Sequence, residues 1–197
     1  MNSIVRIMPD PKLQNEASPP DFRSAMRHLP GGVSVITVGR GSEQSGMTVT
    51  SVSSLSVEPA SLIVSVNRNA SSWPLLKAER AFAVNFLAAD QLEVAERFAG
   101  KGGMKGTERF AGAEWRKRVT GVPLLVGALA AFDCEVEDII ERHSHGIVIG
   151  RVMHVDTGPQ APALAYWQGD YLTVDRDEDM LKLATMSVPN PQSTRKF

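Results

Sequence analysis

A run rich in hydroxyl side chains, residues 46–59, contains the groups best suited to binding a ligand. Six of its residues carry a hydroxyl: Thr48, Thr50, Ser51, Ser53, Ser54 and Ser56. The aliphatic residues between them, such as Val49, are typical of a β-strand. Because hydroxyls are buried only when they are hydrogen-bonded, the run predicts either the wall of a polar ligand site or a solvent-facing edge strand.

A second polar group lies where a predicted strand is followed directly by a predicted helix. Its members are Ser65, Asn67, Arg68, Ser71 and Ser72. Alternation along the strand places Ser65 and Asn67 on the same face, and an early proline marks the helix start. Free N–H groups, two serine hydroxyls and a guanidinium at that start suit a phosphate. Ordinary capping is the alternative, and it accounts for one serine but not for Arg68.

Two further segments carry polar groups that suit a ligand. The strand predicted at residues 82–87 carries Asn85 on the face opposite its apolar side chains. Its amide suits either a flat heterocycle or the backbone of a loop. The run 100–106 has four glycines in seven residues together with Lys101 and Lys105. It predicts a mobile loop whose ammonium groups either meet an anionic ligand or stay in water.

Residues for acid–base, metal or thiol chemistry are sparse. His143 and His145 share a face in an extended strand, but no third ligand accompanies them, so a metal site is a weak hypothesis. The single cysteine, Cys134, lies on the face of apolar neighbours and is predicted to be a buried thiol. The sequence contains no convincing catalytic triad.

A scaffold of strands is required to bring these groups together. Alternating or β-branched runs between glycine- and proline-rich turns predict strands and hairpins at 33–38, 46–57, 62–67, 82–87, 129–140, 146–155 and 164–173. A short helix is predicted to begin at Asp21, because Phe22, Ala25, Met26 and Leu29 recur at helical spacing. That periodicity leads us to expect this helix to lie on a core.

Length and charge limit the class of protein. The chain has 197 residues, with 21 Lys and Arg against 22 Asp and Glu, and no long run of one sign, so neither nucleic acid nor a membrane is an expected partner. We expect a flexible arm at 1–19, one domain at 20–176 and a C-terminal extension or tail at 177–197. A single cysteine and no signal peptide predict a cytoplasmic protein.

The order of several short segments resembles the flavin reductase family, from about Asp21 to Val174. The segments are GVSVIT (32–37), GMTVTS (46–51), SLSVEP (54–59), FAVNFL (82–87), FA (98–99), FAGAEW (110–115) and GVPLLVGALA (121–130), with Cys134 and with His145 five residues before Gly150. Such an ordered set over most of the chain is far more specific than any one of its parts.

The resemblance implies a mainly β fold with flanking helices: a six-stranded antiparallel split β-barrel, usually dimeric, that binds FMN or FAD noncovalently. It also implies an enzyme, in which NADH or NADPH reduces the flavin and the reduced flavin passes to a partner monooxygenase. The sequence decides neither between FMN and FAD nor between NADH and NADPH. Two alternatives remain open, a flavin-binding sensor or store without fast turnover and an all-β interaction module whose hydroxyl run is a wet edge.

Carried over position by position, the resemblance assigns the flavin contacts to three strands and one helix start. They are Thr48, Val49, Thr50 and Ser51; Ser65, Val66 and Asn67; Ala83, Val84 and Asn85; and, at the phosphate, Arg68, Ser71 and Ser72. Lys101 is expected near the phosphate or the adenylate of a dinucleotide. His145 is expected as the catalytic residue near the reactive face of the flavin, where the nicotinamide stacks.

The chain departs from the family pattern beside this histidine. Many members have Gly-Asp-His, whereas this chain has His143-Ser144-His145, so a hydroxyl replaces the carboxylate. Any orienting effect of that acid must come from another group. We expect His145 either to position the nicotinamide or to be a structural histidine at a turn.

Overall fold

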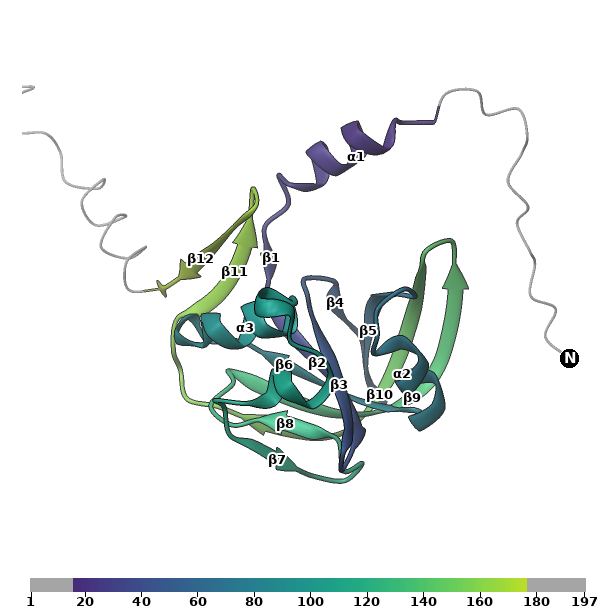
Figure 1. Cartoon of the computed structure of the whole chain (residues 1–197), viewed down its shortest axis with the longest axis vertical. Helices are drawn as coiled ribbons and strands as arrows, with labels where there is room; N and C mark the ends of the chain where they lie inside the picture. Colours follow the sequence, from purple (N-terminus) through teal and green to yellow (C-terminus); the bar gives the residue numbers. More distant parts are fainter. Residues whose placement is uncertain (1–15, 177–197) are drawn as a thin grey trace, which may run out of the picture.

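The computed structural model describes residues 16–176, which form mainly β-structure with short helices (Figure 1). The helices are α1 (Pro19–Met26), α2 (Trp73–Glu79) and α3 (Leu92–Phe98), with 3-10 turns η1 (Ala89–Gln91), η2 (Lys101–Gly103) and η3 (Gly106–Phe110). The strands are β1 (Gly31–Gly32), β2 (Ser34–Arg40), β3 (Glu43–Val49), β4 (Val52–Val57), β5 (Ala60–Asn67), β6 (Ala81–Phe86), β7 (Trp115–Lys117), β8 (Pro123–Leu125), β9 (Ala130–Arg142), β10 (His145–Thr157), β11 (Ala163–Trp167) and β12 (Asp170–Val174).

The main sheet has seven antiparallel strands in the order β3-β2-β6-β9-β10-β5-β4. Two smaller sheets accompany it in the described chain, one of β1, β11 and β12 and one of β7 and β8. The expectation of a mainly β fold is confirmed, and the main sheet has one strand more than the six expected. The hairpins β9–β10 and β11–β12 are also confirmed.

The hydroxyl-rich run 46–59 is divided between two strands rather than forming one. It supplies the end of β3 and all of β4, with Thr50 and Ser51 as the connection between them. Because β3 and β4 form the two opposite edges of the main sheet, the chain crosses from one edge to the other at these two residues. Sequence periodicity did not reveal this break, since hydroxyl and aliphatic residues alternate on both sides of it.

Two apolar clusters pack against opposite faces of the middle strands. Val35 and Ala83 belong to the cluster beneath α3 and β8, whereas Ile36 and Phe82 belong to the cluster that α2 covers. Consequently β2 and β6 are buried on both faces, which explains the unbroken apolar character of residues 33–38. A polar residue on either face of β6 is therefore also buried.

Cys134 is confirmed as a buried thiol. It is 0% exposed on β9, in the cluster that α2 covers. Burial, and then the charge of the adjacent Asp133, raises the pKa of the Cys134 thiol to about 12. The thiol therefore stays protonated at neutral pH and is not a nucleophile.

Helix α1 does not lie on a core, so that expectation was wrong. Ser18 caps the helix by accepting a hydrogen bond from the Asp21 N–H at 3.2 Å. Phe22, Met26 and Leu29 are 62%, 47% and 65% exposed, and Figure 1 shows α1 set apart from the sheets. Helical periodicity correctly indicated an apolar face but gave no information about what that face packs against.

Among the described residues, no helix is both long enough and apolar enough to cross a membrane. Within the same part of the chain, no group of three or more His, Cys, Asp or Glu side chains could hold a metal ion. Residues 1–15 of the expected arm and the whole expected extension at 177–197 lie outside the described residues.

Candidate functional site

A cleft of about 490 Å³ opens between the end of β3, the ends of β5 and β10, and the β11–β12 hairpin. It is lined by Val33, Met47, Thr48, Val49, Thr50, Ser51, Ser65, Asn67, Ala70, Ala99, His145, Tyr166 and Tyr171. Of the residues predicted from the sequence, the structure brings together Thr48, Val49, Thr50, Ser51, Ser65, Asn67 and His145. A mixed wall of apolar side chains with a few polar groups is typical of a small-molecule site.

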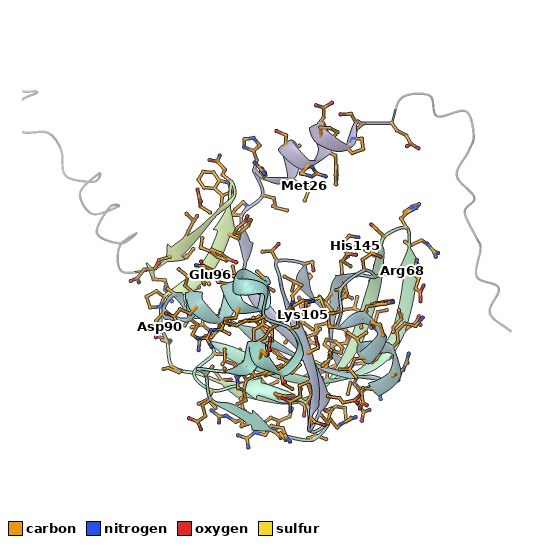
Figure 2. All side chains as sticks on the ribbon, viewed as in Figure 1. Met26, Arg68, Asp90, Glu96, Lys105 and His145 are labelled. Carbon is orange, nitrogen blue, oxygen red and sulfur yellow. The ribbon has the colours of Figure 1, made fainter. Side chains whose placement is uncertain are left out.

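Strand pairing explains why His145 joins residues that lie far from it in the sequence. Strands β5 and β10 are antiparallel partners, with His145 opposite Asn67 and Ile147 opposite Ser65. The turn between β9 and β10 places His145 at the start of β10, next to the end of β5. Figure 2 shows His145 and Arg68 at this side of the opening, with Met26 of α1 across from them.

The cleft hydroxyls differ in how much hydrogen-bonding capacity they retain for a ligand. Thr48 donates to the Ala95 carbonyl at 2.5 Å, and Ser51 donates to the Ser65 carbonyl at 2.8 Å. Thr50 is exposed, and its hydroxyl has no hydrogen bond to a described residue. Thr50 can therefore donate or accept, whereas Ser51 keeps acceptor capacity only.

The other hydroxyls of the run lie elsewhere. Ser53, Ser54 and Ser56 belong to β4 and line a separate groove of about 450 Å³, together with apolar side chains such as Phe132. Only the part of the run before β4 therefore reaches the cleft. For the β4 serines, the interpretation as a solvent-facing edge strand fits the structure better.

His145 is an exposed residue whose ring is held from one side. The Ser144 hydroxyl lies 2.9 Å from His145 Nδ1, so the group that replaces the family's carboxylate contacts the same imidazole. The Ser144 carbonyl accepts a hydrogen bond from the Arg68 N–H at 2.9 Å, which ties the β9–β10 turn to the segment after β5. With Nδ1 engaged, Nε2 is the ring nitrogen left for a ligand.

The predicted phosphate site at the start of α2 is not assembled as expected. The Arg68 guanidinium donates to the His143 carbonyl at 3.0 Å and forms an ion pair with Glu141 at 2.8 Å. Ser72 makes no side-chain cap and is 0% exposed, with its hydroxyl 3.9 Å from the Met47 sulfur. Ser71 is exposed but does not line the cleft. The expectation of a serine cap is therefore wrong for Ser72, and contact between Ser72 and a ligand would require its side chain to leave the buried position that it occupies here.

The Glu141 carboxylate forms ion pairs with two cations beside the cleft, Arg68 and Lys77. Its hydrogen bond from Lys77, and then the charge of Arg68, lower the pKa of the Glu141 carboxyl. The carboxyl therefore stays ionised at lower pH than an ordinary glutamate. Any phosphate that binds Arg68 has to compete with this carboxylate.

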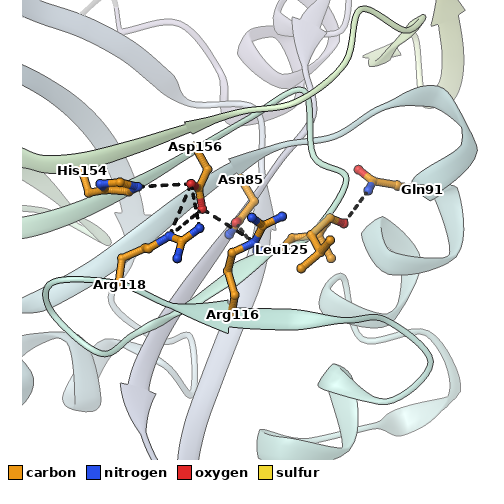
Figure 3. A network of polar contacts seen from close by, with 8 residues as sticks. Asn85, Gln91, Arg116, Arg118, Leu125, His154 and Asp156 are labelled. Atoms are coloured by element: carbon orange, nitrogen blue, oxygen red, sulfur yellow. Dashed lines mark hydrogen bonds and ion pairs between the residues drawn. The ribbon is translucent and has the colours of Figure 1, made fainter.

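Four of the predicted contact residues lie in the core. Val66, Ala83, Val84 and Asn85 are each 0% exposed. The Asn85 amide donates to the Val35 carbonyl at 3.0 Å. The Asn85 side-chain oxygen accepts from the Leu125 N–H at 2.7 Å, and Figure 3 shows these two residues. Asn85 therefore satisfies buried backbone, which is the alternative considered from the sequence. The two apolar clusters cover both faces of β6 and also enclose Val66 of β5, so in this conformation these four side chains are not open to a ligand in the cleft.

Lys101 does not reach the cleft either. Its ammonium pairs with Glu96 of α3 at 2.6 Å, and neither residue lines the cleft. The glycine-rich segment is also anchored, because Arg109 donates to the Gly46 carbonyl at 2.6 Å and to the Met104 carbonyl at 3.0 Å. These contacts link the segment to β3 beside the cleft.

Figure 3 also shows a polar network away from the cleft. The Asp156 carboxylate accepts hydrogen bonds from Arg118 at 3.1 Å and lies 3.1 Å from His154 Nε2. The Arg118 hydrogen bond is the main cause of the lowered pKa of the Asp156 carboxyl, and His154 adds to it. This network joins the segment after β7 to the end of β10, and its members do not line the cleft.

The sequence-based set missed the aromatic wall of the cleft. Tyr166 and Tyr171, from β11 and β12, stack edge to face with ring centroids 5.2 Å apart. Burial raises the pKa of the Tyr171 hydroxyl, so this hydroxyl remains neutral and able to donate. The available signal was the aromatic composition of the predicted hairpin at 164–173, but only the fold places that hairpin beside Thr50.

Comparison with known proteins finds the Flavin reductase like domain family over residues 26–175. A protein named FMN reductase (NADH) RutF from Cronobacter sakazakii is 36% identical over 155 residues, covering 79% of this chain and 92% of that protein. The protein of the same name from Stutzerimonas stutzeri is 38% identical over 151 residues, covering 77% of this chain and 86% of that protein.

Two solved structures are similar over most of the chain. BorF, the flavin reductase component of a bacterial two-component tryptophan halogenase, has a TM-score of 0.74 and 31% identity, covering 81% of this chain and 100% of BorF. The NADH:FAD oxidoreductase SgcE6 of Streptomyces globisporus C-1027 has a TM-score of 0.73 and 30% identity, covering 83% of this chain and 98% of SgcE6.

Proposed function

The chain belongs to the flavin reductase like family, and we propose that it is an NADH:flavin oxidoreductase that supplies reduced flavin to a partner monooxygenase. The observation that carries this function is the cleft, because Thr50, Ser51 and His145 all line it. It occurs in a chain 36% identical over 155 residues to an FMN reductase that uses NADH.

The cleft fits a flavin in size and in the chemistry of its walls. Its volume of about 490 Å³ lies within the usual range for small-molecule pockets. Apolar side chains such as Met47 and Val49 suit the faces of a flat ring, and the polar groups of Thr50, Ser65 and Asn67 suit its edge and its ribityl chain. Thr48 and Ser51 stay in the proposed contact set because both line the cleft.

The redox chemistry is that of the flavin, which accepts hydride from the nicotinamide donor when both are bound. The chain contributes binding and orientation, so it needs no acid–base dyad of its own. His145 presents Nε2 at the cleft, with Ser144 holding the other side of its ring. Tyr166 and Tyr171 add an aromatic wall that suits a flat ring.

Arg68 and Ser71 remain candidates for the flavin phosphate, because Ala70 between them lines the cleft. Binding there requires the phosphate to draw the guanidinium from Glu141, which holds it at 2.8 Å. An exposed ion pair of this kind contributes little free energy, so a dianionic phosphate can replace the carboxylate.

The remaining parts of the proposal concern architecture and assembly. We assign the curled main sheet to the FMN-binding split-barrel class and treat residues 20–176 as one flavin-binding domain. We further propose a homodimer located in the cytoplasm. Sedimentation of the purified protein tests the dimer, and a monomer with full flavin affinity would overturn it.

Initial rates of NADH and NADPH oxidation with FMN, FAD or riboflavin test the proposed function. We expect steady NADH oxidation that depends on added flavin, with NADPH the slower donor. The same measurement identifies the preferred flavin. Tight flavin binding without NADH oxidation would instead identify a sensor or store, and failure to bind any flavin at micromolar concentration would identify an interaction module.

Replacing His145 by alanine is expected to lower kcat/KM for NADH by about tenfold. That factor corresponds to the free energy of about one lost hydrogen bond. The imidazole Nε2 is the group at this end of the cleft that can contact the nicotinamide or the flavin edge. Steady-state kinetics with FMN as acceptor measure the effect, and the Kd for FMN shows whether flavin binding is retained.

His154→Ala is the matched control for this substitution. It removes an imidazole that contacts Asp156 and does not line the cleft. We expect its NADH kinetics to equal those of the wild type. If His145→Ala also left them unchanged, His145 would be a structural histidine at the end of a turn.

A further inference from the structure

The turn between β9 and β10 carries a hydroxyl and an imidazole next to each other at the edge of the cleft. The Ser144 hydroxyl lies 2.9 Å from His145 Nδ1, and both residues are exposed. His145 lines the cleft, whereas Ser144 does not. Any effect of the Ser144 side chain on a ligand in the cleft therefore passes through the imidazole.

Backbone groups of this turn are held by hydrogen bonds from one arginine. The Ser144 carbonyl accepts from the Arg68 N–H at 2.9 Å, and the His143 carbonyl accepts from the Arg68 guanidinium at 3.0 Å. His143 has a φ of 49°, in the left-handed region, which is typical of a tight turn. The β9–β10 turn is therefore fixed to the segment after β5.

Pairing and packing fix the backbone of the histidine itself. His145 is paired with Asn67 of β5 and with Arg142 of β9. The next residue is Gly146, and a Cβ placed there would lie 2.2 Å from a ring carbon of Trp73, so the indole lies directly against this backbone. Only glycine allows that approach. The orientation of the imidazole then depends on rotation about its side-chain bonds, which the neighbouring hydroxyl restricts.

The partner of this imidazole is a neutral group. Glu141, the carboxylate closest to it in the sequence, forms ion pairs with Arg68 and Lys77. Within residues 16–176, no carboxylate forms an ion pair with the His145 ring. The ring is therefore held by a hydroxyl, which can donate a hydrogen bond as well as accept one.

A hydroxyl beside a neutral imidazole decides which ring nitrogen carries the proton. The ring nitrogen is more basic than the hydroxyl oxygen, so the stronger hydrogen bond runs from the hydroxyl to the Nδ1 lone pair, as serine donates to histidine in catalytic triads. The ring proton then lies on Nε2, the nitrogen left for the cleft. A carboxylate at the same place can only accept, so it would hold the proton on Nδ1 instead.

We infer that Ser144 is a positioning residue that keeps the proton of neutral His145 on Nε2, so that the ring donates a hydrogen bond into the cleft. This inference rests on the proposed function, in which the cleft holds the flavin and the nicotinamide. The acceptor is a carbonyl oxygen or a ring nitrogen at the edge of one of these two groups. Because the imidazolium also carries an Nε2 proton, the donor is present in both charge states of the ring.

Kinetics in two backgrounds test whether Ser144 acts through His145. With FMN as acceptor, we expect Ser144→Ala to lower kcat/KM for NADH about threefold, the loss of part of one hydrogen bond. In the His145→Ala background the same change should have no further effect. Ser144→Thr keeps the hydroxyl and should restore the wild-type value. An equal loss in both backgrounds, or no loss in either, would overturn the inference.

The pH profile is a second readout, and a purely structural serine would not affect it. Histidine is the residue type that ordinarily changes charge between pH 5 and 8. The charged or titratable groups around the ring come from β9 and its turn, the segment after β5, α2 and the last hairpin. They are Arg68, Lys77, Glu141, Arg142, His143, Tyr166 and Tyr171.

Ser144→Asp distinguishes a hydroxyl partner from a carboxylate partner. In this variant the neutral ring carries its proton on Nδ1, so the donor at Nε2 is lost as the imidazole loses its charge. We expect the ratio of variant to wild-type kcat/KM to fall about tenfold from pH 6 to pH 9, the loss expected for His145→Ala. Taking the ratio at each pH removes the titration of the flavin phosphate. A ratio that does not change with pH would overturn the inference.

Ser42→Ala and His143→Asn are the matched controls. Ser42 is exposed in the turn between β2 and β3 and does not line the cleft, so its variant should have wild-type kinetics. His143→Asn removes the other imidazole of the β9–β10 turn, and asparagine tolerates the φ of 49° at this position. A pH dependence of Ser144→Asp that disappeared in the His143→Asn background would also overturn the inference.

Nitrogen-15 NMR of the imidazole rings measures the tautomer without turnover. The His145 signals are those absent from the spectrum of His145→Ala. At pH 9 we expect the Nε2-protonated form in the wild type and the Nδ1-protonated form in Ser144→Asp, and an Nδ1-protonated wild type would overturn the inference. A protein that has the expected tautomer but oxidises no NADH would contradict the reductase activity alone, so the two failures are distinguishable.

Discussion

Replacement of both Thr50 and Ser51 by alanine is expected to weaken FMN binding by about tenfold or more. Both hydroxyls line the cleft at the point where the chain crosses between the edges of the main sheet. Each hydrogen bond to a ligand contributes about 0.5–1.5 kcal/mol, so the loss of two corresponds to roughly 5- to 150-fold in Kd. Quenching of flavin fluorescence during titration measures this change.

The structure explains why these two hydroxyls are the ones to remove. The Thr48 hydroxyl is committed to the Ala95 carbonyl at 2.5 Å, so its loss would disturb the packing of α3 on β3 as well as the cleft. Thr50 and Ser51 are exposed, and neither contributes to a core cluster. Their substitution is therefore expected to lower the free energy of unfolding by no more than about 0.5–1.5 kcal/mol, the value of the exposed hydrogen bond from Ser51 to the Ser65 carbonyl.

Ser53→Ala/Ser54→Ala is the control for the double variant. These serines belong to the same hydroxyl-rich run but lie on β4, outside the cleft. We expect the control to bind FMN as the wild type does. Equal FMN affinity in both double variants would mean that the entire run is a solvent-facing edge and that the flavin lies elsewhere.

Asn85→Ala is expected to lower the free energy of unfolding by about 3 kcal/mol without a specific effect on flavin binding. The substitution leaves the Val35 carbonyl and the Leu125 N–H without their partner at a fully buried position. An unsatisfied buried polar group costs about 1–3 kcal/mol. For a domain of this size the melting temperature should fall by roughly 6–12 °C.

Thermal unfolding of the apoprotein measures the stability effect, and FMN titration well below the melting temperature measures the affinity. Asn69→Ala is the matched control, because Asn69 is exposed and its side chain has no hydrogen bond to a described residue. We expect the control to melt as the wild type. A stable Asn85→Ala protein that has lost FMN binding would reassign Asn85 to the flavin site.

Much of the strand content followed from the sequence because strand periodicity is local. Alternation at 62–67 and at 82–87 correctly marked β5 and β6, and the two long β-branched runs around His143 correctly marked the β9–β10 hairpin. Cys134 was correctly placed in the core because its neighbours at two-residue spacing are apolar. Each of these inferences needs only residues that are close in the chain.

The failures share one physical cause, which is that periodicity describes a face but not what covers it. Periodicity left Asn85 open between a heterocycle and backbone, and the resemblance assigned it to the flavin, yet a second apolar cluster buries the face of β6 that contains it. Periodicity also did not reveal that Glu141, distant in sequence, pairs with Arg68, which stays a proposed phosphate ligand. The apolar face of α1 was expected on a core, yet Phe22 and Met26 are exposed.

The sequence by itself determined that a hydroxyl-rich run, a polar strand end and His145 were the groups to consider. Local spacing and residue type carry that information. Only the tertiary structure decided which of them meet, because β3 and β4 are opposite edges of one sheet and β5 pairs with β10. That arrangement selects Thr50 and Ser51 from the run and adds Tyr166 from the last hairpin. Long-range pairing is set by the packing of the whole chain, so no local pattern contains it.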